Sequence, residues 1–238
     1  MFDGRGTFRA VLTYQASLLD QVPAAPHVGV GPGADDSCAD DLSGVRIGEL
    51  GERVQRTELG SGAWVDLRRD WIQGSDELFL RLAEDVPWRA ERRRMYDRVL
   101  DVPRLVRFYR SGEALPDPVL ARARDAVSDH YADELGEPFT SAGMCLYRDG
   151  DDSVAWHGDR LGRGSTADTM VAIVSLGSPR RLSLRPRGGG RQIGFTVGHG
   201  DLLVMGGSCQ RTWEHAVLKT ARPVGPRISV QFRPAGVG

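Results

Sequence analysis

The chain has 238 residues, of which 40% are hydrophobic and 26% are charged, and its formal net charge is −1. These proportions are ordinary for a globular protein and exclude fibrous and intrinsically disordered classes, so one compact domain with an N-terminal elaboration is expected. The net charge also argues against a generic polyanion binder, because sequence-independent affinity for nucleic acid comes mostly from phosphate neutralisation.

Cysteine spacing and hydropathy indicate the cellular compartment in which the protein is expected. The cysteines Cys38, Cys145 and Cys209 lie far apart without a CxxC pair, so neither a disulfide scaffold nor a zinc ribbon is predicted. No stretch approaches the length of a membrane span, and residues 1–16 mix charge and polarity where a signal peptide needs an apolar run. We therefore expect a cytoplasmic protein with no membrane partner.

Arginines are concentrated in two segments. Residues 88–110 contain eight arginines and three acids, and residues 180–191 contain five arginines and no acid. A nucleic-acid surface would explain this segregation. Because Lys219 is the single lysine, the coding bias of a GC-rich genome explains it equally well, and both interpretations stay open.

Two helices are predicted in the first half of the chain, after a loop at 20–45 that is rich in Gly, Pro, Ala and Asp. The first helix has Ser75 as its N-cap, followed by two acidic residues in the first turn, and it ends before Pro87. The second has Asp117 as its N-cap, a proline in its first position and apolar residues at helical spacing, and Gly136 ends it.

After Phe139 the sequence changes to short β-like runs separated by glycine-rich turns. The predicted strands are 143–147, 153–159, 169–176, 181–185, 192–197, 201–205, 213–217 and 227–233. No helical pattern follows residue 140, so the crossovers of a parallel sheet are excluded. The prediction is a mainly β protein with flanking helices (α+β) and a jelly roll as its core.

His157 and Asp159 form a candidate metal site. They are two residues apart and therefore project from the same face of an extended strand, where one metal can contact both. Two histidines and one carboxylate on one triangular face leave coordination positions open, as in non-haem Fe(II) centres. His215, 58 residues after His157, is the candidate third ligand.

A second HxD sequence competes with the first. His199 and Asp201 have the same spacing, but His199 lies between two glycines and precedes an apolar run, which favours a tight turn. His27, in the loop-like segment, and His130, on the second helix, are interpreted as structural.

The C-terminal run Arg227–Arg233 alternates between apolar and polar residues. Ile228, Val230 and Phe232 share one face, and Arg227, Ser229, Gln231 and Arg233 share the other. An edge strand with a solvated face would have this pattern without any function. A pocket for a dicarboxylate would also have it, because the guanidinium fork binds a carboxylate through two hydrogen bonds, and this interpretation is favoured.

Taken in order, five motifs resemble the AlkB family of nucleic-acid dealkylating dioxygenases. They are Tyr147–Gly150 (YRDG), His157–Asp159 (HGD), Gly198–Gly206 (GHGDLLVMG), Trp213–His215 (WEH) and Arg227–Arg233 (RISVQFR), and the similarity runs from about Trp88 to Arg233. The resemblance implies iron binding by His157, Asp159 and His215. It also implies 2-oxoglutarate contacts at Tyr147 and Arg227, with Arg233 as the second arginine of the pocket.

The resemblance also implies the organisation of the chain. Residues 1–50 would be a partly irregular extension, 51–138 a helical and nucleotide-recognition lid region, and 139–238 a double-stranded β-helix. Cys145, at a position that is usually asparagine in the family, and Ser229 are included among the co-substrate contacts. Leu161 replaces a carboxylate that several members carry, so no preference for a particular base is implied.

The implied function is a dioxygenase that uses Fe(II), 2-oxoglutarate and O2 to remove N-alkyl groups from bases in alkylation-damage repair. It would release an aldehyde, succinate and CO2, and act on alkylated DNA or RNA that is single-stranded or has a flipped base. Tyr96, Arg148 and Arg160 are expected to contact this substrate, and the two arginine-rich segments its phosphates.

Two alternatives remain open. The same chemistry could hydroxylate a small metabolite or a protein, or the chain could be a non-catalytic β-sandwich module that binds nucleic acid or a sugar. No protein partner is inferred from the sequence.

Overall fold

The computed structural model describes residues 44–95, 98–159 and 162–237, and over 92–95 and 98–101 it describes the backbone alone. The predictions for Tyr96, Arg160, Leu161, His27 and the loop up to residue 43 lie outside the described residues.

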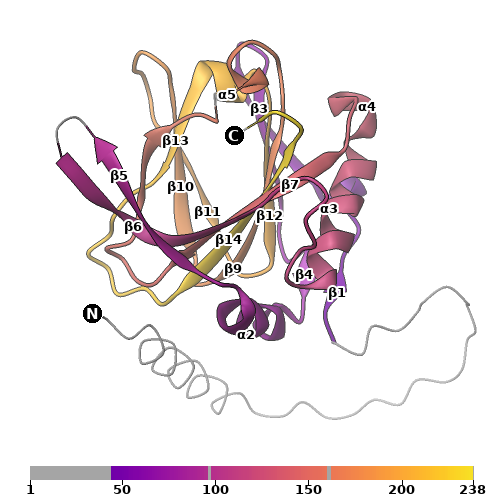
Figure 1. Cartoon of the computed structure of the whole chain (residues 1–238). Coiled ribbons are helices and arrows are strands. Elements are labelled where there is room, and N and C mark those ends of the chain that lie inside the picture. Colours follow the sequence, from indigo (N-terminus) through magenta and orange to yellow (C-terminus); the bar gives the residue numbers. More distant parts are fainter. Residues whose placement is uncertain (1–43, 96–97, 160–161, 238) are drawn as a thin grey trace, which may run out of the picture. The chain divides into compact units, whose positions relative to one another are not determined.

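The described chain is mostly antiparallel β structure with a few helices (Figure 1). Its strands are β1 Arg46–Ile47, β2 Gln55–Gly60, β3 Ala63–Arg68, β4 Ile72–Gln73, β5 Arg89–Met95, β6 Arg98–Tyr109, β7 Phe139–Tyr147, β8 Val154–His157, β9 Val171–Gly177, β10 Arg180–Pro186, β11 Ile193–Val197, β12 Asp201–Gly207, β13 Trp213–Val217 and β14 Arg227–Pro234. Its helices are α2 Ser75–Asp85, α3 Pro118–His130, α4 Ala132–Leu135 and α5 Cys209–Thr212, with 3-10 turns η1 Gly51–Arg53 and η2 Arg163–Ser165.

Two large sheets build the core. The larger has eight strands in the order β2-β3-β12-β9-β14-β7-β6-β5, and the smaller has four in the order β11-β10-β13-β8. Every pair within these sheets is antiparallel. This is the predicted mainly β jelly roll, in which strands distant in sequence come side by side.

The two faces of the larger sheet are covered by different elements. One face packs with the smaller sheet through a buried cluster that includes Ile173, Leu184 and Val217. The other face carries the fully buried Ile228 and Phe232 and is contacted by α2 and α3. The alternation of β14 thus turns its polar residues toward the space between the sheets.

Both predicted helices are present with small corrections. The Asp117 side chain accepts a hydrogen bond of 2.9 Å from the Val119 amide, which confirms it as the N-cap of α3. Tyr131 interrupts the helix before α4, and Gly136 ends α4 in a left-handed conformation. The N-cap of α2 is Gly74 rather than Ser75, because the chain enters this helix through a positive φ of 69°. No described helix is long and apolar enough to cross a membrane.

All eight strands predicted after Phe139 occur; β13 has the predicted bounds and the other seven differ at one or both ends. The region 51–138 is less helical than expected, because β2, β3, β5 and β6 all belong to the larger sheet. Every residue of β3 is buried, although its sequence alternates between apolar and polar residues from Val65 to Arg68. The arginine-rich segment forms the β5–β6 hairpin, which extends outward at the left of Figure 1.

Candidate active site

The three predicted metal ligands meet between the sheets. His157 ends β8 and pairs directly with His215 on β13, while Asp159 follows two residues after His157. Their ligand atoms all lie within 4.8 Å of one another, and within the described part of the chain no other group of three His, Cys, Asp or Glu side chains is this close. Neighbouring strands therefore build a site from residues 58 positions apart.

The two imidazole rings are oriented by backbone and packing. The His157 Nδ1 atom lies 2.8 Å from the Ala155 carbonyl oxygen, which assigns the proton to Nδ1 and leaves Nε2 free to bind a metal. The ring centroids of His157 and His215 are 4.2 Å apart. The His157 Nε2 atom lies 3.8 Å from Asp159 Oδ1, so both face the same point.

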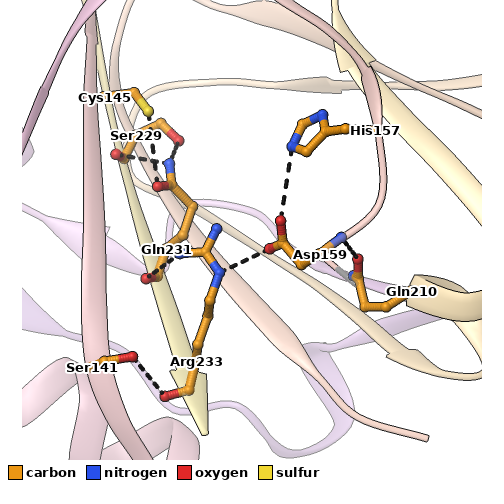
Figure 2. A network of polar contacts seen from close by, with 8 residues as sticks. All are labelled: Ser141, Cys145, His157, Asp159, Gln210, Ser229, Gln231 and Arg233. Carbon is orange, nitrogen blue, oxygen red and sulfur yellow. Dashed lines mark hydrogen bonds and ion pairs between the residues drawn. The ribbon is translucent and has the colours of Figure 1, made fainter. Parts of the chain in front are cut away.

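Asp159 is held from two sides (Figure 2). Its backbone amide donates a 2.9 Å hydrogen bond to Gln210 Oε1 on α5, and its Oδ2 accepts a 2.8 Å bond from Arg233 Nε. Burial by itself would raise the pKa of this carboxyl, but the positive charge of Arg233 and the two imidazoles outweigh burial and lower the pKa to about 2. The side chain is therefore an ionised ligand at neutral pH.

His215 is a neutral ligand for the complementary reason. The side chain is buried, and burial together with the neighbouring His157 lowers its pKa to about 3. A neutral imidazole and an ionised carboxylate are the forms that bind a divalent metal. The donor set thus fits a ferrous ion with two nitrogen ligands and one oxygen ligand.

A cavity of about 90 Å³ opens beside these ligands. It is lined by Arg104, Cys145, Tyr147, Val154, His157, Asp159, Val171, Ile173, Leu182, Val197, His215, Val217, Arg227, Ser229, Gln231 and Arg233. All four polar residues of the β14 run line this cavity, and β14 is a central strand. The alternative of a solvated edge strand is therefore wrong.

Arg227 supplies a buried cation at one end of the cavity. Only 3% of its surface is exposed; its Nε donates a 2.9 Å bond to Ser175 Oγ, and its Nη1 has no hydrogen-bond partner among the described residues. Tyr147 pairs with Arg227 across the sheet, and burial raises the pKa of its phenol to about 12, so it remains a donor. An unpaired buried guanidinium N–H calls for an acceptor, and a carboxylate fits it.

The part of the cavity lining between Arg227 and Arg233 along β14 is formed by Ser229, Gln231 and the neighbouring Cys145 of β7. The Cys145 Sγ atom lies 4.0 Å from Gln231 Oε1, and the Gln231 amide donates to the Ser229 carbonyl at 3.0 Å and to its hydroxyl (Figure 2). Gly143 lies next to this row, and a Cβ atom there would come within 2.7 Å of Arg233 Nη1. A glycine at this position gives Arg233 the space to reach Asp159.

Arg148 is not brought into the cavity. Its guanidinium binds both carboxylate oxygens of Asp152 at 2.8 Å, and its backbone amide also donates to Asp152. Arg180, in the second arginine-rich segment, is buried and donates to three backbone carbonyls, those of Asp149, Asp152 and Leu218. The expectation that Arg180 contacts phosphate is therefore wrong, because its donors fasten loops of the protein itself.

His199 makes a structural turn, as its glycine neighbours predicted. Its Nδ1 accepts a 2.6 Å bond from the Gly177 amide, and its Nε2 lies 3.1 Å from Asp76 Oδ1. Asp201 closes the turn by accepting a 2.7 Å bond from the Gly198 amide. This second HxD sequence therefore has a structural role.

Three residues of the site were not predicted in the places where the structure has them. Gln210 and Gly143 carry no pattern that distinguishes them, and Arg104 was expected to contact phosphate as part of the first arginine-rich segment, whereas it lines the cavity. Only the closeness of Gln210 to His215 in sequence could have drawn attention to it.

Comparison with known proteins identifies the family. The sequence profile of the 2OG-Fe(II) oxygenase superfamily matches residues 104–233, more than half of the chain. The alpha-ketoglutarate-dependent dioxygenase alkB homolog 3 of Bos taurus is 31% identical over 188 residues, which cover 68% of this chain and 62% of that protein. Its Homo sapiens counterpart is 28% identical over 183 residues, with the same two coverages.

Two further matches are more partial. The DNA oxidative demethylase ALKBH2 of Arabidopsis thaliana is 31% identical over 140 residues, covering 49% of this chain and 43% of that protein. A crystal structure of an oxidoreductase of the 2OG-Fe(II) oxygenase family from Burkholderia pseudomallei has 16% identity and a TM-score of 0.47, covering 68% of this chain and 79% of that one.

The chain thus matches 62% of the length of the alkB homolog 3 proteins. The profile match and these relatives agree with a His-Asp-His cluster that lines a cavity together with an arginine whose Nη1 is unpaired among the described residues. The chain is similar to the alkB homolog 3 proteins, and it belongs to the 2OG-Fe(II) oxygenase superfamily.

Proposed function

We propose that this chain is an Fe(II)- and 2-oxoglutarate-dependent dioxygenase that removes N-alkyl groups from nucleic-acid bases. One observation carries the proposal. The three metal-binding side chains and the buried Arg227, with its unpaired Nη1, line the same small cavity. A metal site and a carboxylate site at this proximity suit a co-substrate that is both a chelator and an anion.

His157, Asp159 and His215 would hold the iron. When bound, Fe(II) supplies the redox chemistry that couples conversion of 2-oxoglutarate and O2 to succinate and CO2 with hydroxylation of a C–H bond. One oxygen atom enters succinate and the other enters the substrate. An N-methyl group thus becomes N-hydroxymethyl, which breaks its C–N bond and leaves as formaldehyde.

The remaining residues bind and orient. Arg227 and Tyr147 would hold the distal carboxylate of 2-oxoglutarate, one by charge and one as a neutral hydroxyl donor. Arg233 and Gln210 fix the carboxylate and the backbone of Asp159. Apolar side chains from both sheets, Ile173 among them, keep water from the cavity wall.

Three observations support a nucleic-acid substrate. The relatives are named as an alkB homolog and a DNA oxidative demethylase. The sequence of the β5–β6 hairpin includes most of the first arginine-rich segment, and such a concentration of positive charge suits binding of phosphates. Phe108, on β6, is 46% exposed, although it is a large aromatic residue.

Phe108 suits a role in stacking an unpaired base. It pairs with Gly143, so both residues lie on the face of the sheet that carries Gln231 and Arg233. Base stacking on an aromatic ring contributes about 1–3 kcal/mol per base. Phe108→Ala should weaken binding of a methylated single-stranded oligonucleotide about 5-fold or more. Leu218→Ala, at a residue that is 43% exposed on another segment, is the matched control and should bind as wild type.

The decisive assay measures formaldehyde and succinate from protein supplied with Fe(II), 2-oxoglutarate and a methylated oligonucleotide. We expect both products from wild type and neither from His157→Ala. If an AlkB relative assayed alongside releases formaldehyde and this chain does not, dealkylation is contradicted. If no alkylated oligonucleotide increases succinate formation but a metabolite or protein pool does, the substrate is a metabolite or a protein.

A further inference from the structure

Arg104 is a third arginine of the cavity, beside Arg227 and Arg233, and the proposed chemistry gives it no role. It belongs to β6, where the ladder with β7 pairs Leu105 with Leu146. Continued by one residue, this register brings Arg104 beside Tyr147, whose partner on the opposite side is Arg227. The two arginines thus flank Tyr147 from neighbouring strands, with their backbones about 10 Å apart at two strand spacings.

The guanidinium of Arg104 is anchored but incompletely paired. Its Nη1 donates a 3.0 Å bond to the Ser153 carbonyl, and its Nε is buried without a hydrogen-bond partner in the described part of the chain. The Arg227 Nη1 atom is likewise buried without a hydrogen-bond partner among the described residues. Buried donors are nearly always paired in folded proteins, so two such donors lining one cavity indicate a missing acceptor.

The charge of the cavity leads to the same inference. Its lining includes three arginines, Arg104, Arg227 and Arg233, and one acid, Asp159, which already pairs with Arg233. The lining thus holds no carboxylate to neutralise Arg104 or Arg227. An anion entering the cavity would gain two charged hydrogen-bond donors at once.

We propose that Arg104 is a specificity-determining contact of the co-substrate, holding its distal carboxylate together with Arg227 over the phenol of Tyr147. This inference rests on the proposed function, since it assumes a 2-oxo dicarboxylate as the co-substrate. Two arginines at this end select a dicarboxylate over a 2-oxo acid that lacks the second carboxylate. Arg104 is thus assigned to the co-substrate and not to the nucleic acid.

Arg107 on the same strand provides the matched control. Its guanidinium packs 4.6 Å from the centre of the Tyr109 ring and lies 2.5 Å from Glu113, away from the lining of the cavity. Arg104→Met and Arg107→Met remove the same charge from one strand. Titration calorimetry without oxygen, with Mn(II) in place of iron, compares the affinities of 2-oxoglutarate and 2-oxobutyrate for each protein.

We expect Arg104→Met to weaken 2-oxoglutarate binding about 10-fold to 100-fold, the effect of losing one hydrogen bond to a charged group. The affinity for 2-oxobutyrate should stay within 2-fold of wild type, roughly the scatter of such comparisons. Arg107→Met should leave both affinities unchanged. Arg104→Lys, which keeps the charge and alters the donor geometry, should fall between wild type and Arg104→Met, and it also serves if the methionine variant does not fold.

Two results would overturn the inference. One is unchanged 2-oxoglutarate affinity in Arg104→Met, and if oligonucleotide binding weakens at the same time, Arg104 belongs to the nucleic-acid site. The other is an equal loss of affinity for both 2-oxo acids. If wild type binds Mn(II) and neither 2-oxo acid, the proposed function itself fails, and this outcome is distinct from the other two.

Discussion

Arg233→Met should destabilise the metal-free protein and make it more responsive to metal. In the structure the Arg233 guanidinium is the cation that hydrogen-bonds the Asp159 carboxylate, at 2.8 Å. Without Arg233 the carboxylate stays buried, and the neighbouring His215 cannot replace the lost charge because burial lowers its pKa to about 3. A bound divalent cation supplies positive charge at the same carboxylate, so metal should compensate for the missing guanidinium.

The magnitude follows from burial. The Asp159 side chain is 7% exposed and that of Arg233 13%, so solvent screens the pair weakly. Removing one partner of a buried ion pair costs about 3–5 kcal/mol, and the slight exposure of Arg233 places the expectation at about 3 kcal/mol. In a chain of this length that corresponds to a loss of about 6–12 °C in the unfolding temperature.

The assay is urea and thermal unfolding after chelation, repeated with saturating Mn(II). Arg185→Met is the control, because Arg185 pairs with Glu214 at 2.9 Å in a more exposed setting and should cost less than about 1 kcal/mol. The metal-induced gain in unfolding temperature should be larger for Arg233→Met than for wild type. The prediction is wrong if metal-free Arg233→Met is as stable as Arg185→Met. It is also wrong if metal raises the unfolding temperatures of Arg233→Met and wild type equally.

Three further predictions test the assignment of neighbouring residues. His199→Ala should leave Mn(II) affinity unchanged in calorimetry while costing about 1–2 kcal/mol in urea unfolding, because the buried Gly177 amide loses its acceptor; a loss of metal binding would contradict the structural role. Tyr131→Phe should cost about 2 kcal/mol through the 2.9 Å bond to Asp66 without changing turnover, and a change in turnover at equal stability would be inconsistent with a purely structural network. Because burial raises the pKa of Cys209 to about 12, iodoacetamide at pH 8 should modify Cys145 before Cys209, and 2-oxoglutarate should slow the reaction of Cys145. Peptide mass spectrometry that finds Cys209 modified before Cys145 would be the contrary result.

The β-rich half of the fold could be predicted because its strands are short and turn-bounded. The runs from Phe139 onward are separated by glycine-rich turns, and β14 alternates cleanly, so period and breakers mark them. The earlier strands were missed. In β3 the alternation of apolar and polar residues is only four residues long, from Val65 to Arg68, and in the β5–β6 hairpin the high arginine content hides any strand pattern.

For the candidate site, the choice between two HxD sequences depended on local context. Glycines on both sides of His199 indicated a turn, while the strand-like run before His157 indicated a face with two ligands. The structure agrees, because His199 bonds to Gly177 and His157 pairs with His215. Arg148 shows the limit of such reasoning, since an arginine in a recognisable motif binds Asp152 instead of lining the cavity.

By itself the sequence determined which residues could share a face, because side-chain direction along a strand repeats every two residues and needs no partner. It thereby determined the His157 and Asp159 pair and the polar row from Arg227 to Arg233. Only the tertiary structure decided which faces meet. Strand pairing brings His215 beside His157 and Tyr147 beside Arg227, and the packing of two sheets turns Arg104 into their cavity. These contacts depend on register between distant segments, which no local pattern encodes.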